Sequence, residues 1–186
     1  MPPLAAMKWL WCAWFISWLI AAPWSGRTEA RPKASTEILP RVLTVGGVAV
    51  LFNSRYVFPG TEIWRTPETV GWALVALTTA GFLFCWWARI HLGRMWSSSV
   101  TRKADHRIID TGPYALVRHP IYTGIITASA AAAIDDATPG ALIGLVLIVL
   151  GFWVKARLEE RFLRAELGAE AYEAYFRRTA MLFPGL

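Results

Sequence analysis

The sequence predicts an all-α integral membrane protein with about five transmembrane helices and a C-terminal tail helix. Of its 186 residues, 55% are hydrophobic and 11 are tryptophan, and the mean hydropathy is +0.40. This composition is more apolar and aromatic than that of soluble domains. The apolar residues fall into long runs, and the basic residues gather in alternate loops between those runs. Both features are typical of helical membrane proteins.

The spans follow from length, because a helix of roughly 17 to 25 mostly apolar residues can cross a bilayer with its backbone amides paired internally. The first starts at Leu4 and is rich in tryptophan; its alternative is a cleaved signal peptide ending near Ala21 and Ala22, which the long core and the late Lys8 disfavour. The other four candidates are 38–58, which is the weakest span, a run from about Val70, and the shorter runs 121–134 and 141–154. The last two are joined by "DDATPG", and the small residues of 121–134 predict a tight hairpin.

Charge predicts the orientation, since short cytoplasmic loops collect Lys and Arg. The loops after the first and third spans and the tail are basic, whereas the other side has only Arg65 in its loops, plus Lys8 and Arg55 in or at the ends of spans. We therefore expect a bacterial inner-membrane protein with its N-terminus outside and its C-terminus cytoplasmic. The basic residues that give the net charge of +6 lie beside apolar runs. We therefore expect the lipid bilayer as a partner, and we do not expect nucleic acid.

Metal and disulfide chemistry find no support in the sequence. Cys12 and Cys85 lie inside apolar runs without metal-like spacing, and His91, His106 and His119 are scattered. No dinucleotide-binding, Walker, nucleophile-elbow or zinc-protease motif is present.

Two polar segments flank the predicted hairpin on the cytoplasmic side, where antiparallel helices bring the start of one beside the end of the other. In "GPYALVRHPIYTG" (112–124), Pro120 suits the first turn of a helix. Arg118 and His119 then stand at a helix N-terminus, which favours an anionic group such as a carboxylate. The alternative is an ordinary membrane-anchoring arginine and a histidine satisfied at an interface.

The second segment, "KARLEERFLRAELG" (155–168), has Lys155, Arg157, Glu159 and Glu160 within six residues. Spacings of three and four place several of these charges on shared helix faces. They form either a solvated helix end held by ion pairs or a site at the end of a buried span. The tail that follows has an aromatic side, formed by Tyr172, Tyr175, Phe176 and Leu182. It is either a lid or a membrane anchor, and the anchor needs fewer assumptions.

Together, "GPYALVRHPIYTG", "EERFLRAELGAEAYEAYF" and "FPGL" resemble the isoprenylcysteine carboxyl methyltransferase family and its bacterial relatives. "HLGRMWS" (91–97) also looks like the family's segment ahead of the motif, so the likeness covers roughly 86–186. It implies a single membrane-embedded methyltransferase domain over 1–186, with N-terminal helices in 1–68, a catalytic core in 69–186, and a cytoplasmic C-terminal catalytic segment.

The resemblance implies that S-adenosylmethionine binds between the two polar segments. Carried over by position, the cofactor-binding residues are Tyr114, Arg118, His119, Pro120, Tyr122, Gly124, Glu159 and Glu160. The cofactor's carboxylate suits His119, and its ammonium and sulfonium suit the glutamates.

The resemblance implies an acceptor that is lipophilic or small. Relatives methylate prenylcysteine carboxylates, phospholipid amines or small thiols. A carboxylate acceptor needs a cation to hold it, and the candidates are Arg157 and Lys155, with Glu160 orienting that cation. Lys155 stands where the eukaryotic members have Arg, and Leu167 replaces the family's usual Phe. The alternatives are an NADPH-dependent sterol-reductase-like enzyme and a non-enzymatic membrane scaffold. The sequence does not indicate an oligomeric state.

Overall fold

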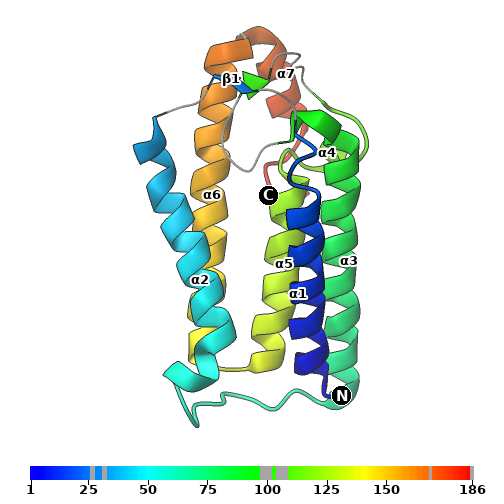
Figure 1. Cartoon of the computed structure of the whole chain (residues 1–186), viewed down its shortest axis with the longest axis vertical. Coiled ribbons are helices and arrows are strands. Elements are labelled where there is room, and N and C mark those ends of the chain that lie inside the picture. The colour runs from blue at the N-terminus through cyan, green and yellow to red at the C-terminus, as the bar shows by residue number, and fades with distance from the viewer. Residues whose placement is uncertain (26–27, 31–32, 97–101, 104–108, 168, 185–186) are drawn as a thin grey trace.

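Five long helices lie side by side in the computed structural model, with shorter elements gathered at one end (Figure 1). The structure describes residues 1–25, 28–30, 33–96, 102–103, 109–167 and 169–184. Its elements are α1 (Pro3–Ile20), β1 (Thr28–Ala30), η1 (Ala34–Glu37), α2 (Ile38–Val57), α3 (Glu68–Leu92), η2 (Gly93–Met95), β2 (Arg102–Lys103), α4 (Pro113–Leu116), α5 (Pro120–Asp136), α6 (Pro139–Leu167) and α7 (Ala169–Arg178).

The prediction of an all-α membrane protein is confirmed at that level. Among the described residues, four helical stretches are long and apolar enough to cross a membrane: Pro3–Ile20, Ala34–Val57, Glu68–Met95 and Pro139–Ala165. α5 has 17 residues and so rises roughly 26 Å at 1.5 Å per residue. It runs alongside the other four helices (Figure 1). The sequence did not suggest the short antiparallel pairing of β1 with β2.

Prolines and one residue with a positive φ mark the boundaries of three helices. Pro3 and Pro120 stand in the first turns of α1 and α5, where a missing backbone N–H costs nothing. α5 ends at Asp136, the next residue Ala137 has a left-handed φ of 56°, and Pro139 then begins α6. The predicted turn between these two helices is therefore present.

The glycines of the long helices make their closest contacts outside the predicted hairpin of α5 and α6. α5 packs mainly on α3, and α6 packs mainly on α2. A Cβ on Gly81 would lie 2.7 Å from the carbonyl oxygen of Gly124, and one on Gly47 would lie 2.7 Å from that of Gly144. Since only glycine permits this approach, the small residues join α3 to α5 and α2 to α6.

α1 packs on α3 through aromatic rings, and one buried arginine of α3 donates hydrogen bonds to the residues that follow α1. Trp14 stacks on Phe82 with ring centroids 5.0 Å apart. Arg89, which is 1% exposed, donates to the carbonyls of Ala21 at 3.0 Å and Trp24 at 2.8 Å. Cleavage of α1 as a signal peptide would remove this packing.

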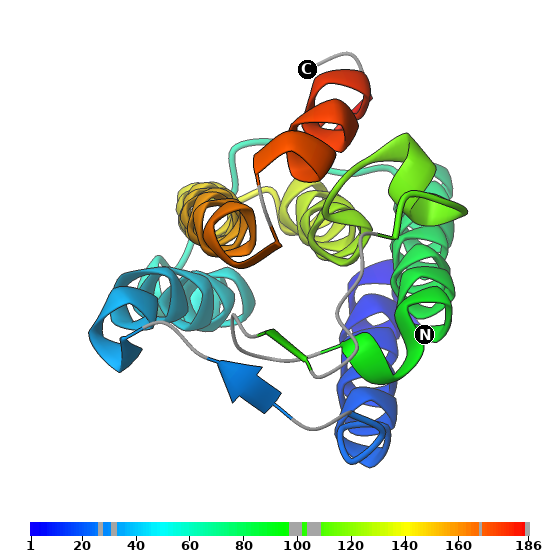
Figure 2. The same ribbon diagram turned by 90° about the horizontal axis from the view of Figure 1, so that it is seen from above.

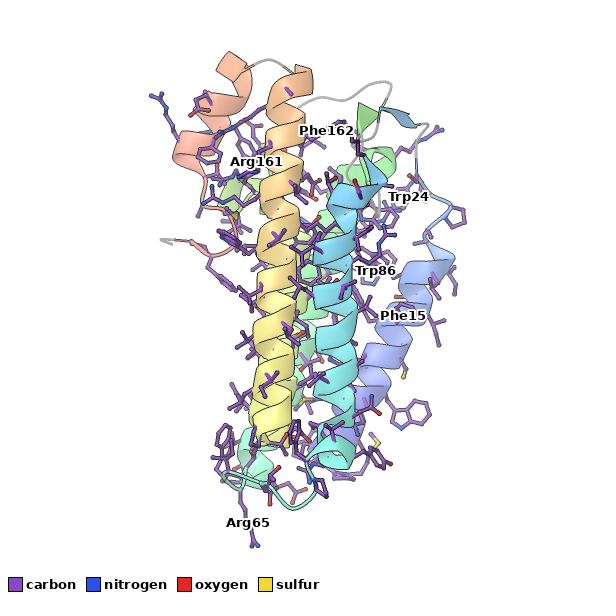
Figure 3. All side chains as sticks on the ribbon, turned by 90° about the vertical axis from the view of Figure 1, so that its left-hand side faces the viewer. Phe15, Trp24, Arg65, Trp86, Arg161 and Phe162 are labelled. Atoms are coloured by element: carbon purple, nitrogen blue, oxygen red, sulfur yellow. The ribbon has the colours of Figure 1, made fainter. Side chains whose placement is uncertain are left out.

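The two ends of the bundle differ in charge and in structure. Arg161 lies at the end where α7, β1 and the loops gather, and Arg65 extends from the opposite end (Figure 3). We call the first the tail end and the second the Arg65 end. Both predicted polar segments lie at the tail end, where α5 begins and α6 ends (Figures 1 and 2).

Candidate functional site

The candidate site forms where the start of α5, the last turns of α6 and the C-terminal tail meet. The extended residues after α7 run beside 117–119: the amide of Arg118 donates to the carbonyl of Ala180 at 2.8 Å, and that of His119 to the carbonyl of Met181 at 3.1 Å. The two polar segments predicted from the sequence are thus brought together, and the tail completes one side.

Arg118 is the buried centre of this junction, and its side chain is 6% exposed. Its Nε donates to Glu160 at 2.7 Å, and its Nη1 donates to the carbonyls of Phe176, at 3.0 Å, and Thr179. Its guanidinium also lies 3.9 Å from the centroid of the Phe176 ring. Arg118 therefore joins α5, α6 and the tail. Its role is to hold these segments together, and it is not a membrane-anchoring arginine.

His119, Tyr122 and Glu159 form a second group of contacting side chains, in which His119 is buried and Glu159 is partly exposed. The His119 ring stacks on the Tyr122 ring at 5.2 Å, and Tyr122 donates its hydroxyl proton to Glu159 at 2.8 Å. His119 also lies between the two carboxylates, with its Nε2 3.3 Å from Glu160 and its Nδ1 3.8 Å from Glu159. Glu159 is 30% exposed at its side chain and Glu160 is 4% exposed, so only Glu159 retains substantial access to a ligand.

Lys155 and Arg157 lie on different faces of α6. The Lys155 ammonium lies 5.3 Å from the centroid of the Tyr122 ring, beside the site. Arg157 is exposed, and its guanidinium lies 5.4 Å from the ring centroid of Trp153, on the outer surface. The structure therefore brings Lys155 to the cluster and leaves Arg157 outside it.

A cavity of about 70 Å³ lies beside Lys155, between the start of α2 and the end of α6. Its lining mixes charged and apolar side chains: Glu37, Pro40, Arg41, Thr44, Phe152, Lys155 and Leu158. Arg41 pairs with Glu37 at 3.1 Å on the rim. The cavity can hold a group that is part polar and part apolar.

Three other residues carried over from the family have structural positions. Tyr114 is buried, and its carbonyl accepts the Tyr175 hydroxyl proton at 2.8 Å. Burial raises the pKa of both phenols, so they stay protonated and can donate. Pro120 opens α5, and Gly124 packs against α3, where a Cβ would lie 2.5 Å from Sγ of Cys85.

The tail contacts the site directly. Phe176 and Thr179 bind Arg118, and the carbonyl of Leu182 accepts a hydrogen bond from Thr123. These contacts favour the interpretation of the tail as a lid over the site. The simpler interpretation, a plain membrane anchor, does not account for them. The side chains of Tyr172 and Leu167, and His106 entirely, lie outside the described residues.

Sequence reasoning missed Phe152, whose ring stacks on Tyr122 at 4.8 Å. The spacing could have revealed it, because 152, 155 and 159 recur at three and four residues and so share one helix face. It also missed the roles of Thr179 and Phe176, which bind through backbone carbonyls that any residue supplies. No group of three metal-binding side chains occurs in the part of the chain that the structure describes.

A model of a known protein family matches the part of the chain that contains most of this site. The model of the isoprenylcysteine carboxyl methyltransferase family matches residues 70–165, slightly more than half of the 186-residue chain. The match includes α3, both polar segments as far as 165 and the helices that position them, and it leaves out α1, α2 and α7. No curated protein matches the chain. Members of this family are membrane methyltransferases that generally use S-adenosylmethionine. On the extent of the family match, the chain belongs to the isoprenylcysteine carboxyl methyltransferase family.

Proposed function

We propose that this protein transfers a methyl group from S-adenosylmethionine to a lipophilic or small acceptor at the cytoplasmic face of the membrane. The observation that carries the proposal is the cluster of His119, Tyr122 and Glu159, with Lys155 beside it, inside the family-matched region. The cationic tail end supports the cytoplasmic placement.

The cluster has the chemistry to hold S-adenosylmethionine. The cofactor has two positively charged groups, an ammonium and a sulfonium, and one carboxylate. Glu159 is a partly exposed carboxylate, so it can pair with one of these cationic groups. In the described part of the chain, the amides of Ile121 and Tyr122 have no backbone acceptor, so they can receive the carboxylate.

The other carried-over residues act as supports in this proposal. Arg118 and Glu160 fix the position of His119 and the tail, because their charges are already paired. Tyr114 and Pro120 hold the turn before α5, and Gly124 sets the distance of α5 from α3. The precise orientation of the site thus depends on buried groups that do not touch the ligand.

When bound, S-adenosylmethionine supplies an electrophilic methyl group on a positively charged sulfur. A carboxylate acceptor is ionised at neutral pH and needs no general base. The protein's contribution is alignment and exclusion of water. The stacked rings of His119, Tyr122 and Phe152 supply a rigid apolar wall for this purpose.

The acceptor's polar end fits beside Lys155. Of the two candidate cations, Lys155 is favoured because it lies by Tyr122 and the cavity, whereas Arg157 lies over Trp153. Glu160 was expected to orient this cation, but it pairs with Arg118 at 2.7 Å and with His119 at 3.3 Å instead. Phe152 and Leu158 give the same small cavity apolar surface, so it suits the carboxylate end of a prenylcysteine-like acceptor, whose lipophilic body would lie outside it.

Ligand titration tests this proposal against the reductase and scaffold alternatives. The detergent-solubilised protein is titrated by calorimetry with S-adenosylmethionine, S-adenosylhomocysteine and NADPH. We expect both adenosyl compounds to bind and NADPH not to bind. Binding of NADPH alone would establish the reductase, and no binding of any of the three would favour the scaffold. A labelled methyl donor then screens prenylcysteines, lipids and thiols as acceptors.

The same titration on variants locates the site. His119→Ala and Glu159→Gln should weaken binding of the adenosyl compounds by about tenfold or more, as expected for loss of a contact to a charged ligand. Glu173→Gln is the matched control, because Glu173 is a carboxylate on α7 paired with Arg164 on the surface. Equal affinities in all three variants would refute the placement of the cofactor.

A further inference from the structure

The Arg65 end of the bundle contains a second charged cavity, far from the candidate site. It has a volume of about 160 Å³ and lies between α1, α2 and α5. It is lined by Leu4, Lys8, Leu51, Phe52, Arg55, Tyr56, Ala132 and Asp136. One side is therefore apolar, and the other side holds two cations and one carboxylate.

The carboxylate of Asp136 is fully engaged by its own surroundings. Its Oδ1 accepts from Arg55 Nε at 2.7 Å, and its Oδ2 accepts from Thr138 at 2.7 Å and from Ser54. Its side chain is 7% exposed. Asp136 therefore positions Arg55 and has no oxygen left for a cationic ligand.

The two cations retain hydrogen-bond donors. Arg55 uses Nε and Nη2 on Asp136, with Glu62 at 3.5 Å from Nη2 on the rim, and its Nη1 makes no hydrogen bond to the residues that the structure describes. Lys8, an exposed residue of α1, forms no hydrogen bond or ion pair with any described residue. An unpaired lysine inside an apolar span is costly unless it serves a ligand or reaches the headgroups.

We propose that this cavity binds the phosphate headgroup of an anionic phospholipid. The free donors of Lys8 and Arg55 match a phosphate. Leu4, Leu51 and Phe52 supply the apolar surface for the start of an acyl chain. The volume is roughly ten times the 10–15 Å³ that one water molecule needs, so the cavity can hold a phosphate group. The apolar walls favour a lipid over free phosphate.

A bound lipid would connect the two helix pairs. α1 packs mainly on α3 and α2 packs mainly on α6, and the cavity lies where α1 and α2 face each other. A lipid held by Lys8 on one side and Arg55 on the other would stabilise this junction. It also explains why two cations occur in spans at the end whose loops are otherwise poor in basic residues. The proposal does not depend on the methyltransferase activity.

Native mass spectrometry of the full chain tests the proposal. The protein in detergent is titrated with phosphatidylglycerol, with phosphatidylcholine of the same acyl chains, and with glycerol phosphate. We expect phosphatidylglycerol to bind more tightly than the other two. Lys8→Gln should weaken that binding by about five- to tenfold, and Lys8→Arg should restore it. Arg65→Gln, at the same end but extending away from the bundle (Figure 3), should change nothing.

Several results would overturn the proposal. Equal affinity for the two lipids would mean an apolar site without headgroup recognition. Binding of glycerol phosphate as tight as that of phosphatidylglycerol would mean a phosphate site rather than a lipid site. An equal loss in Lys8→Gln and Arg65→Gln would mean a general effect of charge. Because Lys8 has no partner in the described residues, Lys8→Gln should unfold at the wild-type temperature in phosphatidylcholine, which verifies that the variant is folded.

Discussion

Glu159 and Glu160 are adjacent in the chain, but the protein uses them differently. Glu160 points into the junction of α5, α6 and the tail, where Arg118 and His119 surround it. Glu159 points toward Tyr122 and remains partly exposed. Successive helix positions differ by about 100°, so two neighbouring carboxylates can serve a structural pair and an open site at the same time.

Glu160→Gln should therefore lower stability, and Glu159→Gln should not. Removing one partner of a buried ion pair leaves the other charge uncompensated, at a cost of about 3 kcal/mol or more. We expect thermal unfolding in detergent to begin at a clearly lower temperature for Glu160→Gln than for Glu159→Gln. If both variants unfold at the wild-type temperature, Arg118 does not depend on Glu160 as the structure indicates.

The two cations of α6 provide a second pair for comparison. Lys155→Gln should raise the KM for a carboxylate acceptor by about tenfold and leave cofactor affinity unchanged, because the lost contact is to the acceptor alone. Arg157→Gln, two residues further along and on the outer surface, should leave both values unchanged. Steady-state kinetics with the acceptor found in the screen measure both. The opposite result would assign the acceptor to Arg157.

At the scale of the helices, adjacent glycines of α2 have opposite surroundings. A Cβ on Gly47 would lie 2.7 Å from the carbonyl oxygen of Gly144 and 2.9 Å from the amide of Ile148, whereas a Cβ on Gly46 would meet nothing within 4 Å. Backbone atoms cannot move aside as a flexible side chain can. The contact between α2 and α6 therefore depends on Gly47.

Gly47→Ala should destabilise the protein by about 1 to 3 kcal/mol, the usual cost of overpacking. Gly46→Ala should be neutral or slightly stabilising, because alanine is the better helix former. Thermal unfolding of the two variants in the same detergent measures the difference. Equal unfolding temperatures would mean that α2 and α6 are further apart than the structure shows.

The sequence predicts the helices well because each depends on local composition. The segment predicted as 38–58 is α2, Ile38–Val57, and the run from about Val70 is α3, from Glu68. α6 extends beyond the predicted 154 to Leu167, since its charges continue at helical spacing with no proline or glycine before 168. Which helices pack together was not predicted. The small residues of α5 indicate a close neighbour but do not identify it as α3.

The same distinction applies to the site. His119 and Glu159 could be predicted to lie together, because a short turn joins two antiparallel helices and fixes which ends meet. The carbonyl partners of Arg118 could not, since Phe176 and Thr179 contribute backbone groups, and a carbonyl leaves no signal in the sequence. The different directions of Lys155 and Arg157 follow from helix geometry, but only once the face of α6 that packs on α5 is known.

For the whole molecule, the distribution of charge predicts how it sits in the membrane. Arg161 lies at the tail end and Arg65 at the opposite end (Figure 3), and Arg118 lies at the tail end too, where it contacts Glu160 and Phe176. Lys and Arg are retained on the cytoplasmic side during insertion. The tail end, with the candidate site, should therefore face the cytoplasm.

Single cysteines introduced at the two ends test this orientation. Arg65→Cys should react with a membrane-impermeant maleimide in intact cells, and Arg161→Cys should react only after the cells are permeabilised, because both side chains are exposed but at opposite ends (Figure 3). The native Cys12 and Cys85 lie within α1 and α3, where a charged reagent in water does not reach them, so the unaltered chain is the control. Labelling of Arg161→Cys alone in intact cells would reverse the orientation. It would then place the methyl donor's site outside, away from the cytoplasmic supply of S-adenosylmethionine, and so contradict the proposed function as well.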